Sequence, residues 1–368
     1  MKILNTIGIK YNYRNILSVY KPIIILLQIT GFDFKVFKFK PAFNITIKLY
    51  YICLLICSLY ITIMCFILDL TYHVWTILEY STSIIILMLY KSKLTNFFTE
   101  MNKLDVYLRV NRKHYIQHKN RTYIYTIFLW IVRIIYCGFY FAMFSFPKNI
   151  LFYIILHLSS FALDMNRVWR FILLDTVRYR LKLLRIRLEE DPRCNYYLYV
   201  KDMRNYTENK IKFCLHLYRR IADMVDLITP ELLNGSIFVS VVCSLPKLII
   251  NVYHILLVFE GHEETFSAGF IVMHIFQICF FIFSPCIVVE MYAMEVEKIR
   301  LFLMHRLIDE KDTKIKEDLH IFFDYTSIRT FRYKIWRCFP VNICLPIDIA
   351  SICTSYVIVL INFTHLYG

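Results

Sequence analysis

The sequence is poor in glycine and in charge. Its 368 residues include only seven glycines, and charged residues make up 19% of the chain, whereas hydrophobic residues make up 58%. Soluble globular domains carry about 25% charged residues and are less apolar. The mean hydropathy is +0.51, and several apolar runs approach the roughly 20 residues that a membrane-spanning helix needs. The composition therefore predicts a polytopic membrane protein.

Sequence motifs of the common enzyme classes are also absent. There is no GxGxxG, P-loop, HExxH or GxSxG sequence, and none of the twelve cysteines or eleven histidines has zinc-type spacing. These absences predict no enzymatic activity, no cofactor and no metal site. The net charge of +15 is expected to reflect basic cytoplasmic loops, so no nucleic-acid partner is expected.

Seven apolar segments are long enough to cross a membrane, and each is expected to be a helix because lipid offers no partner for free backbone groups. They cover about 48–68, 72–90, 123–146, 149–174, 236–259, 266–291 and 343–366. The connecting segments on one side hold 37 Lys and Arg residues, and those on the other side hold one. By the positive-inside rule the N-terminus is cytoplasmic and the C-terminus is extracellular. The predicted fold class is an all-α integral membrane protein with seven transmembrane helices.

This orientation is the reverse of that of a G-protein-coupled receptor, and the Asp/Glu-Arg-Tyr and Asn-Pro-x-x-Tyr sequences of that class are missing. The inner segments 176–190, 198–228, 291–310 and 313–337 are expected to be helical, either as solvated helices or as a cytoplasmic anchor where subunits meet. The apolar run 22–30 is too short to span and is expected at the inner membrane face or beside the first span.

Charged residues interrupt two of the spans. Asp164, Arg167 and Arg170 lie in the inner half of the fourth span, and Lys247 lies deep in the fifth. A charged group at membrane depth more often faces a partner or a cavity than lipid. Lys247 is therefore expected to pair with an acidic residue of a neighbouring span.

The last span carries Ser355-Tyr356, five aliphatic residues, and then Asn362-Phe363. This pattern resembles the C-terminal Thr-Tyr-x5-Gln-Phe signature of the insect gustatory receptors, with Ser355 in place of Thr and Asn362 in place of Gln. The inverted seven-span topology is a second likeness to the insect gustatory and odorant receptor channels. The family usually has an acidic residue fourteen positions before the signature Tyr, where this chain has Asn342.

The resemblance implies a homotetrameric, ligand-gated, non-selective cation channel in the plasma membrane of sensory neurons, with the last helix lining the pore. Helical spacing places Ser355, Val359 and Asn362 on one face, with Phe363 beside it. The predicted pore and gate residues are Ser355, Tyr356, Val359, Asn362 and Phe363. The alternative is that Asn362 forms a hydrogen bond with a neighbouring helix of the same subunit.

A ligand pocket is expected between the outer halves of spans two to six, because small-molecule sites combine aromatic walls with a few polar groups. The polar and aromatic residues there are Trp75, Glu79, Tyr136, Tyr140, Tyr153, His157, Asn251, His254, His274 and Gln277. For each residue singly, packing between helices is the competing interpretation.

The sequence thus predicts two functional units: residues 1–293, with the first six spans and the ligand-binding bundle, and residues 294–368, with the anchor helices and the pore helix. The expected partners are a small-molecule tastant, permeating cations, membrane lipid and three further subunits, identical or from related receptors. The high aromatic content favours bitter, moderately apolar ligands. An odorant receptor subunit that needs a co-receptor, and a transporter or enzyme of inverted topology, are the alternatives.

Overall fold

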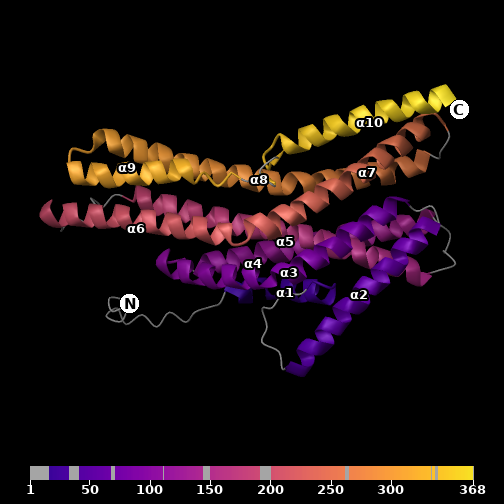
Figure 1. Ribbon diagram of the computed structural model, residues 1–368, viewed down its shortest axis with the longest axis horizontal. Coiled ribbons are helices and arrows are strands. Elements are labelled where there is room, and N and C mark those ends of the chain that lie inside the picture. Colours follow the sequence, from indigo (N-terminus) through magenta and orange to yellow (C-terminus); the bar gives the residue numbers. More distant parts are fainter. Residues whose placement is uncertain are drawn as a thin grey trace.

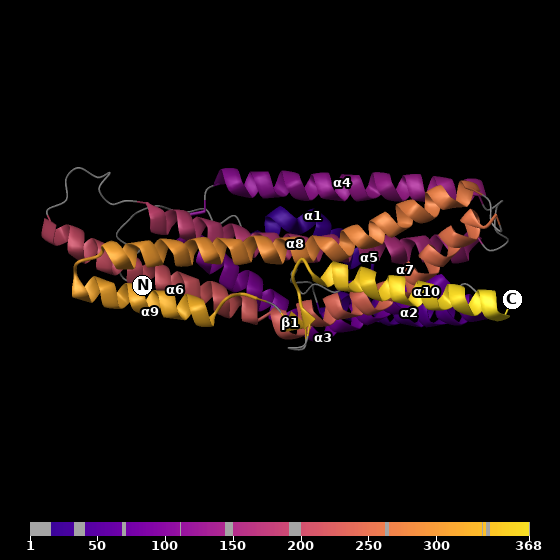
Figure 2. The ribbon, with the colours of Figure 1, turned by 90° about the horizontal axis from the view of Figure 1, so that it is seen from above.

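The computed structural model is almost entirely helical. It describes residues 16–32, 41–67, 71–110, 112–143, 150–190, 200–261, 265–332, 334–335 and 339–367. The helices run roughly along one long axis, so that the molecule is elongated (Figure 1). The C-terminus lies at one end of this axis, here called the outer end, and α6 and α9 lie toward the other, the inner end (Figure 2).

The elements follow one another as a series of helices with one small hairpin. They are α1 (Ile16–Ile29), α2 (Pro41–Ile67), α3 (Thr71–Tyr107), α4 (Arg112–Met143), α5 (Ile150–Glu189), α6 (Val200–Asp226), the π-helical turn η3 (Thr229–Leu233), α7 (Asn234–Phe259), α8 (Thr265–Asp309), α9 (Thr313–Ile328), β1 (Lys334–Ile335), β2 (Phe339–Pro340) and α10 (Leu345–Tyr367). The seven predicted spans fall on α2, α3, α4, α5, α7, α8 and α10. The predicted all-α, seven-span architecture is confirmed.

Five stretches of the described chain are long and apolar enough to cross a membrane: in α2, in α3, in η3 with α7, in α8 and in α10. The third and fourth predicted spans, α4 and α5, are not among these five. They carry Arg133, Asp164, Arg167 and Arg170, all of which are largely buried inside the bundle. These side chains bind groups on neighbouring helices, as expected for charged residues at membrane depth.

The inner part of the molecule is built from extensions of the spans. The predicted inner helices 176–190 and 291–310 are continuations of α5 and α8, and 198–228 corresponds to α6. The predicted helix 313–337 is too long, because α9 ends at Ile328. Phe331 has a φ of 55°, which a right-handed helix does not accept. The chain then forms the β1–β2 hairpin, in which Lys334 pairs with Pro340 and Ile335 with Phe339.

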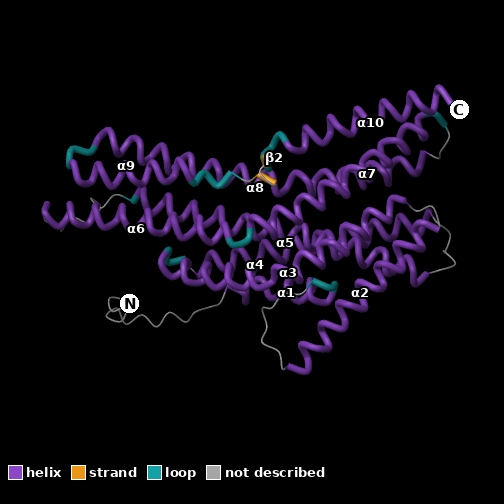
Figure 3. The backbone as a smooth tube through the Cα atoms, viewed as in Figure 1, coloured by secondary structure: helices purple, strands orange, loops and turns teal. Residues whose placement is uncertain are grey.

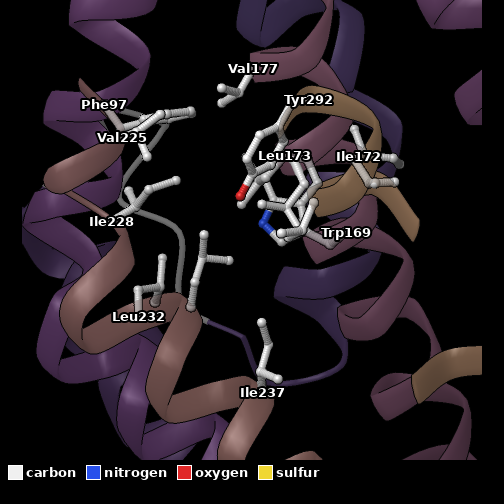
Figure 4. Packing of buried hydrophobic residues seen from close by; sticks show 14 of the residues in the cluster. Phe97, Trp169, Ile172, Leu173, Val177, Val225, Ile228, Leu232, Ile237 and Tyr292 are labelled. Atoms are coloured by element: carbon white, nitrogen blue, oxygen red, sulfur yellow. The ribbon is translucent and has the colours of Figure 1, made fainter. Parts of the chain in front are cut away.

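A continuous apolar core joins the outer and inner parts (Figure 4). Trp169 of α5 and Tyr292 of α8 are almost fully buried there. The Trp169 ring contacts Tyr20 and Phe98, with centroid distances of 5.7 and 5.9 Å. Further apolar side chains of α5 and of neighbouring elements surround this point, namely Phe97, Ile172, Leu173, Val177, Val225, Ile228, Leu232 and Ile237. This packing ties the spans to the inner helices.

The first helix packs inside the bundle and not along the membrane face. Ile23, Ile24 and Leu27 of α1 are fully buried, and α1 lies against α3, α4 and α5. The hydroxyl of Tyr50 on α2 donates to the Ile29 carbonyl at 2.5 Å. The apolar run 22–30 was expected at the inner membrane face or beside the first span; the structure packs α1 mainly on α3, α4 and α5, with Tyr50 as a contact to the first span, α2.

Gly31, at the end of α1, gives a test of this packing. Its φ is +102°, and a Cβ there would lie 2.8 Å from Leu54 Cδ1 and 2.9 Å from the Tyr80 hydroxyl, which donates to the Thr30 carbonyl at 2.6 Å. Gly31→Ala is expected to lower the free energy of unfolding by roughly 2–3 kcal/mol, from left-handed strain and the disturbed hydrogen bond. The measurement is the thermal unfolding midpoint in detergent.

Gly261→Ala is the matched control, since Gly261 has a φ of +80° and no atom lies within 4 Å of the position that a Cβ would take there. Gly261→Ala introduces the backbone strain without a steric clash, so it is expected to lower the unfolding midpoint less than Gly31→Ala does. Equal midpoints for the two variants would contradict the close packing of α1.

Candidate functional site

A small cavity lies between the outer parts of α3, α4, α5, α7 and α8. The volume open to the centre of a water molecule is about 30 Å³, which is room for one or two waters. Its walls combine aromatic, apolar and charged side chains, namely those of Tyr72, His73, Thr76, Arg133, Tyr136, Leu156, His157, Ser160, Leu163, Asp164, Arg167, Lys247, His274, Gln277 and Ile278. A drug-sized ligand needs several hundred Å³, so the cavity in this conformation is too small to hold one.

On one side of the cavity, the lining residues Arg167 and Lys247 bind the carboxylate of Glu79. Glu79 is fully buried on α3. Arg167 of α5 donates to it from Nε at 3.1 Å and from Nη2 at 2.7 Å. Lys247 Nζ of α7 lies 2.9 Å from Glu79 Oε2, and the Ser240 hydroxyl donates at 2.5 Å. The expectation that Lys247 pairs with an acid of a neighbouring span is confirmed, and the pair links α3, α5 and α7.

A second buried carboxylate, Asp164 of α5, joins the remaining helices. Arg133 of α4 donates to Asp164 Oδ2 from Nε at 2.9 Å and from Nη2 at 2.5 Å. Gln277 Nε2 of α8 donates to the same oxygen at 2.7 Å. Arg167 Nη1 lies 3.5 Å from Asp164 Oδ1, so that Arg167 bridges both carboxylates. We call Glu79, Arg133, Asp164, Arg167 and Lys247 the buried charge network.

The outer side of the cavity is aromatic. Tyr136 stacks at an angle on His157 and His274, with centroid distances of 6.0 and 5.7 Å. His274 forms hydrogen bonds with the Tyr72 hydroxyl and with Asn251 Nδ2. These contacts tie α3 and α7 to α8 above the charge network.

The structure brings together part of the predicted pocket. Tyr136, His157, His274 and Gln277 line the cavity, and Glu79 and Asn251 contact lining residues. Trp75 and His254 are not among its lining residues. The side chains of Tyr140 and Tyr153 lie outside the described residues. The lining residues that the pocket prediction missed, above all Arg133 and Asp164, were marked in the sequence by charge inside an apolar span.

The last helix, α10, lies at the edge of the bundle and packs on α7 and α8 (Figure 3). The buried stripe that makes this contact consists of Leu345, Ile349, Cys353 and Val357. Because each helical residue advances by about 100°, Ser355, Val359 and Asn362 lie on the opposite face, and all three are exposed. Tyr356 lies beside them and is 59% exposed. The side chain of Phe363 is outside the described residues.

Asn342 has a structural role at the start of α10. Its side-chain Oδ1 accepts from the backbone nitrogen of Cys344 at 3.1 Å and of Leu345 at 3.3 Å. This satisfies backbone donors at a helix N-terminus. Pro346 follows in the first turn, where a missing backbone N–H has no cost.

The charge network predicts a strong dependence on Glu79. In Glu79→Gln, the guanidinium of Arg167 and the ammonium of Lys247 lose a buried counter-charge, which is expected to lower the free energy of unfolding by roughly 3–5 kcal/mol. Glu100→Gln, on the same helix, removes a partly exposed pair with Lys103 and Arg220 and is expected to cost at most about 1 kcal/mol. Thermal unfolding midpoints measure both, and a Glu79→Gln midpoint at or above that of Glu100→Gln would contradict this role.

No protein-family model matches the sequence, and no curated protein matches it significantly. Among solved structures, the chain is similar to the insect olfactory receptor OR5 from Machilis hrabei, with a TM-score of 0.67 and 14% identity over 95% of this chain and 99% of that chain. It is also similar to the same receptor in complex with eugenol, with a TM-score of 0.61 and 15% identity over 96% and 100% of the two chains. The fold of this chain is therefore that of an insect olfactory receptor, and the predicted resemblance to the insect chemoreceptors is confirmed at the level of the fold.

Proposed function

We propose that the chain is an insect chemoreceptor that acts as a ligand-gated, non-selective cation channel, formed by four copies around a shared axis. The likeness in fold over nearly the whole length of an insect olfactory receptor is the observation that carries this proposal. The Ser355-Tyr356 and Asn362-Phe363 pairs favour a gustatory receptor, which responds to a tastant. We place this channel in the plasma membrane of sensory neurons.

The proposed pore element is α10. Its contacts within the chain use one stripe, so the opposite face, with Ser355, Val359 and Asn362, is free to face an axis. Asn362 and Phe363 form the outer gate, with Tyr356 on its flank. Val359, 48% exposed, lies about one turn inward and gives an apolar ring that closes by dewetting.

The apolar surface of the inner part supports contact between copies of the chain. Large side chains of α8 and α9 that lie beyond the predicted membrane region are exposed, among them Leu301 (54%), Ile308 (68%) and Ile328 (80%). Apolar patches of this kind mark contact surfaces between proteins. Residues 294–368 then form the anchor and pore unit, and residues 1–293 the ligand-binding unit. The boundary falls within the continuous helix α8, so the division is functional.

The proposed ligand site is the cavity bounded by Tyr136, His157, His274, Gln277 and the charge network. A ligand opens the channel when it binds the open form more tightly than the closed form. Lys247 of α7 is in the cavity wall, and α7 packs against α10. Movement of α7 and α8 on ligand binding would therefore carry the pore helix with it.

The pore assignment predicts that Asn362→Ala changes the current. Removing the amide at the outer constriction is expected to alter the relative permeability to Na⁺ and Ca²⁺ or the ligand concentration for half-activation, by a factor of about three or more. Whole-cell recording from cells that express only this chain measures both. Thr354→Ala, an exposed polar position of α10 at the side of the helix, is the control with little expected change.

Unaltered gating and permeation in Asn362→Ala would count against the pore assignment. They would favour a hydrogen bond from Asn362 to a neighbouring helix of the same subunit.

The orientation gives an independent prediction. An epitope tag at the N-terminus is expected to bind antibody only after the cells are permeabilised, whereas a tag after Gly368 is expected to bind in intact cells. The reason is the concentration of Lys and Arg at the inner end. Accessibility of both tags in intact cells would contradict the proposed topology.

An odorant receptor subunit is the second candidate, favoured by the likeness to OR5. It would need a co-receptor for function. Ligand-evoked current from this chain expressed alone, with a panel of bitter, sugar and volatile compounds, supports the gustatory assignment. Current that appears only with a co-receptor supports the odorant assignment. No ligand-gated current in either case would favour the inverted-topology transporter or enzyme.

A further inference from the structure

The cavity has more positive than negative charge in its walls. Arg133, Arg167 and Lys247 line it, and Asp164 is the one carboxylate among the described lining residues. Glu79 supplies a second carboxylate behind Arg167 and Lys247. Three cations therefore share two carboxylates in a region where all five groups are about nine-tenths buried or more.

The two carboxylates have little capacity left. A carboxylate can accept about four hydrogen bonds. Glu79 accepts from two nitrogens of Arg167, from Lys247 and from Ser240. Asp164 accepts from two nitrogens of Arg133 and from Gln277, with Arg167 at 3.5 Å. Glu79 therefore has no free acceptor for a ligand ammonium group, and Asp164 has only Oδ1, which already faces Arg167; the three cations would also repel such a group.

Two of the cations, Lys247 and Arg133, line the cavity and can meet a ligand. Lys247 donates to Glu79 alone among the described residues, although an ammonium has three N–H groups. Arg133 uses Nε and Nη2 for Asp164, and its guanidinium lies over the Tyr136 ring in the cavity wall, 5.3 Å from the ring centroid. An anion that enters the cavity would accept from the remaining N–H groups of Lys247, meet the guanidinium of Arg133 and cancel the excess charge.

We propose that this cavity takes the carboxylate of a small organic acid, with Lys247 and Arg133 as its donors. Leu156, Leu163, Ile278 and the ring of Tyr136 form the apolar part of the wall, so the rest of the ligand is a short aliphatic or aromatic skeleton. This inference names the ligand class of the proposed receptor and rests on that function only for its link to current.

Binding of an acid at these residues would also weaken a contact between two helices. A ligand carboxylate competes with Glu79 for Lys247, and the Glu79–Lys247 pair joins α3 to α7. The cavity has room for only one or two waters, so a ligand enters as the helices separate. The acid thus binds the separated arrangement more tightly, which is the condition for a shift of the equilibrium.

The test measures binding directly, on the full chain purified in detergent at neutral pH. The probes are straight-chain and phenyl-substituted skeletons of roughly three to eight carbons, each as carboxylate, primary alcohol and primary amine. Tryptophan fluorescence titration and thermal shift report binding. The carboxylates of at least one skeleton are expected to bind at least about tenfold more tightly than the matching alcohol, and the amines more weakly than either.

Two variants test the site. Lys247→Gln is expected to weaken acid binding about tenfold and to leave alcohol binding within about twofold, because Glu79 keeps its bonds to Arg167 and Ser240. Thr76→Glu places a carboxylate in the cavity wall, where it cancels the excess charge, and is expected to fold and to lose acid binding. Lys103→Gln, a change on an exposed lysine of α3, is the matched control with unchanged binding.

No carboxylate binding by any skeleton, equal affinity for acids and alcohols, or acid binding unchanged in Lys247→Gln and Thr76→Glu would each overturn the proposal. Acid binding without any current contradicts the channel function and leaves the acid site standing. Currents evoked by alcohols or amines and not by acids support the channel and overturn the acid site.

Discussion

The arrangement of the spans depends on the need to neutralise charge inside a bundle surrounded by lipid. Five charged side chains lie on α3, α4, α5 and α7, and each carboxylate is bonded to at least two cations. A charge at this depth without a partner is costly. The helices must therefore keep the rotation and depth that bring Glu79 and Asp164 to Arg133, Arg167 and Lys247. The apolar core below them fills the space between helices, but it is the charge network that specifies which faces meet.

This constraint also explains why the network and the cavity occur together. Charged side chains from four helices converge around two carboxylates, and the cavity lies beside this point. The aromatic groups Tyr136, His157 and His274 cover the network on the outer side. The cavity therefore has charged side chains on one side and aromatic rings on the other. Small-molecule sites likewise combine aromatic walls with a few polar groups.

Much of the fold follows from the sequence, because the length and apolarity of a spanning helix are fixed by the bilayer. The seven spans were predictable for this reason, and the inner extensions of α5 and α8 from helix propensity and the spacing of apolar residues. The end of α9 was not, since periodicity continues past Ile328 while the backbone turns at Phe331. In the sequence, Asn342 stands out only as a departure from a family pattern, and its role as the cap of α10 emerges from the backbone geometry.

The site was predictable in part. That Lys247 needs an acid follows from its place in an apolar run, but the choice of Glu79, 168 positions away in the chain, depends on which helices are neighbours. Trp75 and His254 lie at suitable depths and yet do not line the cavity, because composition does not fix the rotation of a helix about its own axis. The functional division within α8 likewise has no structural boundary to mark it.

That α8 is a single helix of 45 residues has a mechanical consequence. At 1.5 Å per residue it is about 67 Å long, and it carries Gln277 of the cavity near one end and the surface of Leu301 and Ile308 near the other. Pro285 lies close to its midpoint and lacks the backbone donor that would stiffen it there. The helix can therefore bend at Pro285, so that the cavity end and the inner end can change their angle to each other while the chain stays helical.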